Sequence, residues 1–181
     1  MAALCLAACS NEPALTLSGL DPQAFVGEKD GKATALYTLT NANGMEVCIT
    51  NFGGRLVSVM VPDKDGKMVD VILGFDNIND YMTKPSDFGA SIGRYANRID
   101  GGKFELDGQT VVLNQNDGQN CLHGGAEGWQ YQVYEAEQVD PQTLKLTIVD
   151  PDGHMGFPGT VTAVVTYKLT DDNAIDITYE G

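Results

Sequence analysis

Short stretches in which apolar and polar residues alternate recur through the body of this chain, and glycine-rich turns separate them. The clearest runs from Lys103 to Leu113, where Asp107-Gly108 supplies the turn residues that a tight hairpin places at positive φ. From Val161 to Leu169 every second residue is apolar, which is typical of a half-buried antiparallel strand. No segment shows sustained helical periodicity. The sequence therefore predicts an all-β fold built as an antiparallel β-sandwich.

The same reasoning places the other strands and leaves one long gap between them. We expect a hairpin of 35–39 and 45–50, a strand covered on both faces at 56–61, a strand at 69–75, and later strands at 129–136, 143–149, 160–169 and 174–179. Between 76 and 91 the apolar residues follow neither a strand nor a helix periodicity. We expect a long ordered loop there that packs over one face. The sequence stops at Gly181 directly after its last expected strand. That would leave an open sheet edge, so we expect the protein to continue.

Charge and cysteine usage restrict the partners. The formal net charge of −14, with 11 basic residues scattered among 25 acidic ones, argues against nucleic acid, which needs clustered Lys and Arg. Of the 4 cysteines only Cys48 and Cys121 lie in the body, so no disulfide framework is expected. We interpret Cys48 as a small buried residue.

The first residues are small and apolar and end in Leu6-Ala7-Ala8-Cys9, which resembles a bacterial lipobox, where the cysteine is diacylated and becomes the new N-terminus. The run is too short to span a bilayer and has no basic region before it, so the alternatives are a start further upstream or an Ala-rich tail. We expect residues 1–9 to be a lipoprotein signal remnant and residues 10–33 a tether. Lipidation of Cys9 would anchor the protein to a membrane of the bacterial cell envelope, as a periplasmic or outer-membrane lipoprotein.

Polar side chains and paired glycines gather between Gly93 and Gly125. The first part reads Gly-Arg-Tyr-Ala-Asn-Arg-Ile over 93–99, and the last reads Asn-Cys-Leu-His-Gly-Gly over 120–125. Arginine, amide and histidine side chains can hydrogen-bond several hydroxyls at once, and glycine lets backbone approach a ligand closely. This stretch is suited to a polar, uncharged ligand such as a sugar.

Three motifs in order, 93–99, Leu-His-Gly-Gly at 122–125 and Asp-Gly-His-Met-Gly-Phe-Pro-Gly at 152–159, resemble the successive signatures of the aldose 1-epimerase (galactose mutarotase) family. The similarity runs from about Thr34 to the last residue and covers the N-terminal half of what that family contains. It implies a galactose mutarotase-like supersandwich, truncated on its C-terminal side, whose N-terminal part is residues 34–181.

The family's reaction, as the resemblance implies, interconverts the α and β anomers of free hexoses such as galactose and glucose. A base takes the proton of the C1 hydroxyl while an acid protonates the ring oxygen, and no metal or other cofactor is needed. The family's general-acid histidine belongs to a later His-Ser-Tyr-Phe-Asn type motif, and its general-base glutamate lies further on. Neither motif occurs in these 181 residues. We therefore assign no catalytic residue and expect this chain alone to be inactive or weak.

The resemblance implies roles for three residues as substrate ligands. Asn97 and Arg98 match the family's Asn-Arg pair, which hydrogen-bonds sugar hydroxyls, and His123 matches the histidine that lies against the sugar. Without the resemblance, Arg98 could equally be an ion-pair partner on a sheet surface. Gly124 and Gly125 would let backbone approach the sugar ring.

Three further residues have alternative interpretations. Arg94 could bind the sugar or hold its own loop. Trp129 could be core or a stacking platform, and we favour core. His154 stands where the family usually has an acidic residue, and we expect it to be an exposed loop residue.

Two other function classes compete with the epimerase. A non-catalytic carbohydrate-binding module on the same fold would explain the missing acid and base. A glycoside hydrolase needs two carboxylates flanking a cleft, and no recognisable pair is present. The sequence leaves the preferred aldose and the oligomeric state open.

Overall fold

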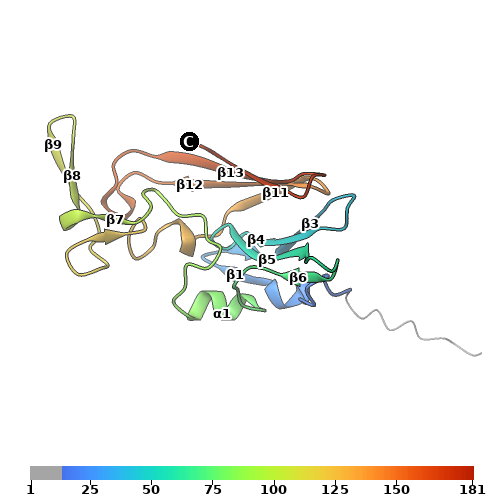
Figure 1. Ribbon diagram of the computed structural model, residues 1–181. Coiled ribbons are helices and arrows are strands. Elements are labelled where there is room, and N and C mark those ends of the chain that lie inside the picture. Colours follow the sequence, from blue (N-terminus) through green and yellow to red (C-terminus); the bar gives the residue numbers. More distant parts are fainter. Residues whose placement is uncertain (1–13) are drawn as a thin grey trace, which may run out of the picture.

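Two antiparallel four-stranded sheets stack face to face in the computed structural model, which describes residues 14–181 (Figure 1). The first has the order β3-β4-β5-β6, with β3 Leu36–Thr40, β4 Glu46–Thr50, β5 Arg55–Pro62 and β6 Met68–Asp70. The second has the order β11-β12-β13-β14, with β11 Glu135–Asp140, β12 Thr143–Asp150, β13 Val161–Leu169 and β14 Ile175–Glu180. The predicted all-β sandwich is confirmed.

The main core lies between these sheets. Val47 and Ile49 of β4 are fully buried against Leu144 and Leu146 of β12 and Val165 of β13. Alternation on β12 and β13 turns their apolar positions inward, as expected for sheets that bury one face. The strand β5 is buried on both faces over most of its length, as its continuous apolar run predicts.

A second core covers the other face of the first sheet. It is closed by the 3₁₀ turn η1 (Pro22–Phe25) and the helix α1 (Ile78–Thr83). The small hairpin of β1 (Gly27–Lys29) and β2 (Lys32–Thr34) is joined to η1 by a hydrogen bond from Thr34 Oγ1 to the Phe25 carbonyl oxygen. Phe25 is completely buried and packs near Tyr81 of α1. The segment expected to be a tether therefore does not extend to residue 33: from Leu20 onward it is folded onto the body. The expected lipoprotein signal at 1–9 lies outside the described residues.

A separate hairpin, β8 (Lys103–Leu106) with β9 (Gln109–Val112), stands away from the sandwich (Figure 1). Asp107 and Gly108 form its turn with φ of 52° and 75°, as predicted. A third, small core around Phe157, Leu113 and Cys121 anchors its base. Gly108 is replaceable by few residues, because only glycine and a few polar residues adopt positive φ at low cost.

Three expected elements are wrong. The strand expected at 69–75 ends at Asp70, because the Asp70 side chain accepts hydrogen bonds from the backbone of Val59 and Ile72 and turns the chain away. The segment 76–91 packs over one face, as expected, but it is not a loop throughout. It contains α1, which is capped by Asn77 and is too short at 6 residues to show a period. The expected strand at 129–136 begins instead with a 3₁₀ turn, η3 (Trp129–Tyr131), and β11 starts only at Glu135.

Among residues 14–181, no helix is both long and apolar enough to cross a membrane.

Candidate functional site

A two-stranded ladder brings the first two sequence motifs together. The strand β7 (Arg98–Ile99) pairs antiparallel with β10 (Cys121–Leu122), and Arg98 lies opposite Leu122. Asn97 and His123, the residues just outside this ladder, therefore face each other although they are 26 positions apart. This register brings two segments that look separate in the sequence next to each other.

Asn97 and His123 are joined by a reciprocal pair of hydrogen bonds. The Asn97 backbone N–H donates to His123 Nδ1 at 3.0 Å, and the His123 backbone N–H donates to the Asn97 carbonyl oxygen at 3.1 Å. Both residues have positive φ, 66° and 53°. Because the Asn97 N–H donates to Nδ1, this nitrogen must carry a lone pair, and the proton of the neutral ring is on Nε2. His123 can therefore donate an Nε2–H hydrogen bond to a ligand oxygen.

Arg98 is oriented by a carboxylate from the loop before β10. Its Nε donates to Asp117 Oδ2 at 2.6 Å, while Nη1 lies 3.5 Å from Asn97 Oδ1. Its side chain is 54% exposed. One edge of the planar guanidinium is thus fixed, and its terminal N–H groups keep the capacity to donate to two neighbouring hydroxyls. The ion pair with Asp117 agrees with a structural role as well, so sugar binding by Arg98 stays a prediction.

A hollow of about 580 Å³ opens beside Arg98 and is lined mainly by aromatic and arginine side chains. Its lining consists of Arg94, Tyr95, Arg98, Ile99, Asp100, Phe104 and Phe157. Tyr95 is 55% exposed, and an exposed aromatic ring offers a surface on which an apolar ligand face can pack. The size falls in the range of roughly 300–1,000 Å³ that is typical of small-molecule sites. Asn97 and His123 lie at the neighbouring ladder rather than in this lining.

The paired glycines serve the packing of the chain. A Cβ added at Gly124 would lie 1.9 Å from the Gly93 carbonyl oxygen, and one at Gly93 would overlap the Trp129 ring at 1.9 Å. One at Gly125 would meet Met155 at 3.0 Å. The close approach that these glycines permit in the structure is to other parts of this chain, and backbone contact with a sugar at Gly124 and Gly125 stays a prediction. Trp129 is 8% exposed within the main core, so the core interpretation is confirmed.

Arg94 has a structural role. Its Nε donates to Asp150 Oδ2 at 2.5 Å. Its Nη groups donate to the carbonyl oxygens of Asp150, Pro151, Pro158 and Gly159. With 12% of its side chain exposed, Arg94 ties its loop to both ends of the Asp150–Gly159 segment.

The expectation that His154 is an exposed loop residue is wrong. Its side chain is 19% exposed, and Nδ1 lies 2.5 Å from Oδ1 of Asp150, which is itself 3% exposed. His154 opens the 3₁₀ turn η4 (His154–Gly156), four residues beyond Asp150, so the turn brings its ring back over the end of β12. A histidine in a Gly/Pro-rich sequence gives no sign of this partner, because Asp150 lies just beyond the strand expected at 143–149 and has no motif that links it to His154.

Sequence reasoning also missed two residues that build the site. Asp117 orients Arg98, and Asn116 holds β10 by accepting from the Leu122 backbone N–H at 2.8 Å and donating to the Leu122 carbonyl oxygen at 3.0 Å. The Asn-Asp-Gly sequence at 116–118 indicates a turn. Its nearness to the histidine motif was the only available signal.

Comparisons with known proteins identify the family of this chain. The family model described as Aldose 1-epimerase matches residues 35–181. The chain is 40% identical over 152 residues to an aldose 1-epimerase of Escherichia coli K12, and this covers 84% of the chain and 44% of that protein. It is 38% identical over 151 residues to a galactose mutarotase of Bos taurus, covering 83% of the chain and 44% of that protein.

Solved structures give the same result. A GalM/aldose epimerase homologue from C. elegans superposes with a TM-score of 0.78 at 31% identity, covering 81% of this chain and 45% of that one. A galactose 1-epimerase from Lactobacillus acidophilus gives a TM-score of 0.75 at 30% identity, covering 84% and 45%. The chain thus spans slightly less than half the length of these relatives. On sequence, fold and the order of its motifs, this chain belongs to the aldose 1-epimerase family.

Proposed function

We propose that this chain forms the sugar-binding part of an aldose 1-epimerase that interconverts the anomers of free hexoses such as galactose and glucose. The observation that carries the proposal is the meeting of Asn97, Arg98 and His123 at the β7–β10 ladder. Relatives named aldose 1-epimerase and galactose mutarotase support the reaction class.

The chemistry of these three residues is binding and orientation. Arg98 presents its terminal N–H groups to vicinal hydroxyls while Asp117 fixes the guanidinium plane. His123 Nε2–H donates to a ring or hydroxyl oxygen, and the backbone bond at Nδ1 holds this tautomer. Such donors hold the sugar in one pose, so that an acid and a base can act on the ring oxygen and on O1.

The proton-transfer groups belong, in this proposal, to sequence outside these 181 residues. General acid and base catalysis contributes typically about 10² to 10⁴ per group, so the chain alone should anomerise sugars slowly. The alternative function is a carbohydrate-binding module, which would bind galactose without any turnover.

The test combines polarimetry with binding. Freshly dissolved α-D-galactose is followed with this chain and with a version extended by the downstream reading frame, and affinity is measured for both. The proposal expects galactose binding by both and rapid anomerisation by the extended protein. Binding by both without anomerisation by either would establish the binding module instead.

Substitution tests the site. Arg98→Ala and His123→Ala should each weaken galactose binding by about tenfold or more, because each removes hydrogen bonds to the ligand. Lys64→Ala is the control, since its side chain is 85% exposed at a turn of the first sheet. Unchanged affinity in both site variants would refute the assignment.

We further propose that Cys9 is lipidated and anchors the protein in the bacterial cell envelope. The support is the lipobox-like Leu6-Ala7-Ala8-Cys9 sequence. Cys9→Ser should move the protein from the membrane fraction to the soluble fraction of its native host. An unchanged distribution would remove the anchor from the proposal.

A further inference from the structure

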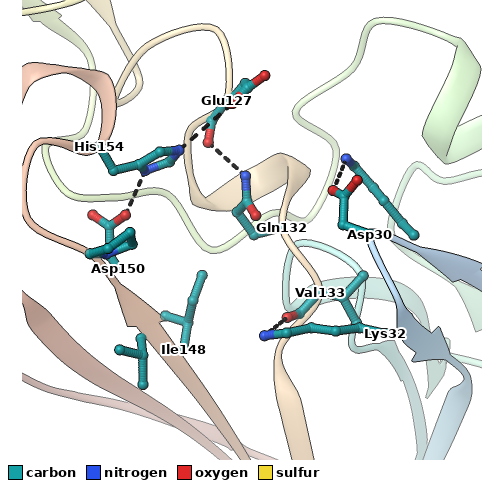
Figure 2. A pocket seen from close by; sticks show the side chains of 11 residues that line it. Asp30, Lys32, Glu127, Gln132, Val133, Ile148, Asp150 and His154 are labelled. Carbon is teal, nitrogen blue, oxygen red and sulfur yellow. Dashed lines mark hydrogen bonds and ion pairs between the residues drawn. The ribbon is translucent and has the colours of Figure 1, made fainter.

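Figure 2 shows a second cavity, of about 340 Å³. It shares no lining residue with the Arg98 hollow. Three separate segments enclose it: the β1–β2 hairpin, the loop around η3, and the end of β12 with η4. The polar side chains among its lining are Lys29, Asp30, Lys32, Glu127, Gln132, Asp150 and His154. Every wall comes from described residues, so the cavity is formed by this chain itself.

His154 lies at one wall with its hydrogen-bonding direction fixed. Its Nδ1–H donates to Asp150 Oδ1 at 2.5 Å, and Asp150 Oδ2 is held by Arg94. In the neutral ring, Nε2 then carries a lone pair. Glu127 Oε2 is 3.9 Å from Nε2, which is too long for a direct hydrogen bond (Figure 2). His154 Nε2 is therefore able to accept a hydrogen bond from a ligand hydroxyl.

The lysines and Glu127 retain further capacity. Lys29 Nζ is 2.5 Å from Asp30 Oδ2, and Lys32 Nζ is 3.4 Å from the Val133 carbonyl oxygen. An ammonium group has three donors, so each lysine keeps N–H groups for a ligand. The Glu127 side chain is 70% exposed and can accept at both carboxylate oxygens. Donors and acceptors thus stand around one cavity.

The lining carries charges of both signs. Lys29 and Lys32 are positive, and Asp30, Glu127 and Asp150 are negative. Outside the lining, Arg94 pairs with Asp150, and Glu135 Oε1 lies 3.8 Å from Lys32 Nζ. The lining therefore has no excess of positive charge that would attract an anion. Its mixture of donors and acceptors favours an uncharged ligand whose groups both donate and accept, while Ile148 and Val133 offer apolar contact to its C–H groups.

We propose that this cavity is a second saccharide-binding site, separate from the candidate active site. It requires no ring opening and does not rest on the proposed epimerase function. Its ligand is an uncharged sugar held by Lys29, Lys32, Glu127 and His154. The Arg94–Asp150 ion pair lies between the two sites, with Arg94 at the hollow and Asp150 at the cavity.

The two histidines of the chain give one reporter for each site. D-galactose is titrated into the protein at constant pH while the imidazole C–H resonances of His123 and His154 are followed by NMR. The proposal expects both resonances to shift, each with its own saturation curve. A His154 resonance that stays unmoved up to the highest soluble galactose concentration would overturn it.

Variants separate the sites. Lys32→Ala with Glu127→Gln, both exposed positions, should weaken the His154 response by about tenfold or more, as loss of charge-assisted hydrogen bonds would, and leave the His123 curve unchanged. Lys64→Ala with Asp65→Asn removes the same charges from an exposed ion pair and should change neither.

Arg98→Ala is the converse test: it should weaken the His123 response by about tenfold or more and leave the saturation curve of His154 unchanged. If Arg98→Ala weakens both responses equally, the His154 shift is only transmitted from the first site and the second site does not exist. If His154 responds while His123 never does, the second site stands and the sugar-binding assignment of Arg98 and His123 fails.

Discussion

At the scale of single residues, the candidate site depends on side chains that fix other side chains. Asp117 illustrates this. It is not itself a predicted sugar ligand, but its carboxylate holds one edge of the Arg98 guanidinium. Both partners are substantially exposed, so the pair adds little to stability. Its contribution is to orientation.

Asp117→Ala should therefore lower galactose affinity by roughly three- to tenfold, with a change in the free energy of unfolding below about 1 kcal/mol. Calorimetric or NMR titration and urea denaturation measure the two quantities. Asp65→Ala, which removes an exposed carboxylate from the surface ion pair with Lys64, is the control. A stability loss in Asp117→Ala that accounts for the affinity loss would contradict a positioning role.

Gly124 tests the close packing of the two motifs. Gly124→Ala combines a φ of +84° with a Cβ 1.9 Å from the Gly93 carbonyl oxygen, and should cost roughly 3 kcal/mol or more. Gly66→Ala has a similar φ of +78° with nothing within 4 Å, so only backbone strain of about 1–2 kcal/mol is expected. Urea denaturation of both variants gives the comparison. Equal losses would show that the contact with Gly93 relaxes freely.

At the scale of elements, Arg94 connects the loop before β7 to the end of β12 and to the turn after η4. Its partner Asp150 is 3% exposed. Removing the cation from a buried carboxylate strongly destabilises the folded state. Segments without regular structure are thereby held against the second sheet.

Arg94→Met should lower the free energy of unfolding by about 3–5 kcal/mol and increase amide exchange along 150–159. Lys84→Met is a matched control, because its pair with Asp80 is on the surface and contributes less than about 1 kcal/mol. Hydrogen exchange and chemical denaturation are the measurements. Unchanged protection of the 150–159 amides in Arg94→Met would contradict the structural role of Arg94.

At the scale of the whole molecule, burial affects the alkaline limit of stability. Burial raises the pKa of the Cys48 thiol to about 11, and burial also raises the pKa of Tyr134 and Tyr167. A group whose folded pKa is raised holds its proton more tightly in the folded state. Its contribution to stability is complete below the unfolded pKa and is lost as the pH rises through the folded pKa.

Stability should therefore decline as the pH rises from near 9, the ordinary thiol value, towards 11 and above. Urea denaturation at a series of pH values measures the slope. Cys48→Ala should make the decline shallower by removing one of the titrating groups. A free energy of unfolding that rises over this window would contradict the argument.

Much of the architecture was predictable from local patterns. The β3–β4 and β8–β9 hairpins and the strands β5, β12, β13 and β14 were all expected, because alternation and turn residues act over a few positions. The misses share a different cause. Asp70 and Asn77 change the chain direction through hydrogen bonds from backbone N–H groups to their side chains. At the start of η3, the Trp129 backbone N–H donates to the Gly93 carbonyl oxygen, which is distant in the sequence.

The sequence by itself determined the class of fold and the family motifs, because these depend on residue identity and spacing. The roles of Asn97, Arg98 and His123 as sugar ligands are implied by the family resemblance and stay a prediction. Only the tertiary structure decided that Arg98 is held by Asp117 and that Arg94 is structural. It also decided that His154 pairs with a buried carboxylate. Such pairings depend on strand register and sheet stacking, which place residues in contact without any pattern between them in the sequence.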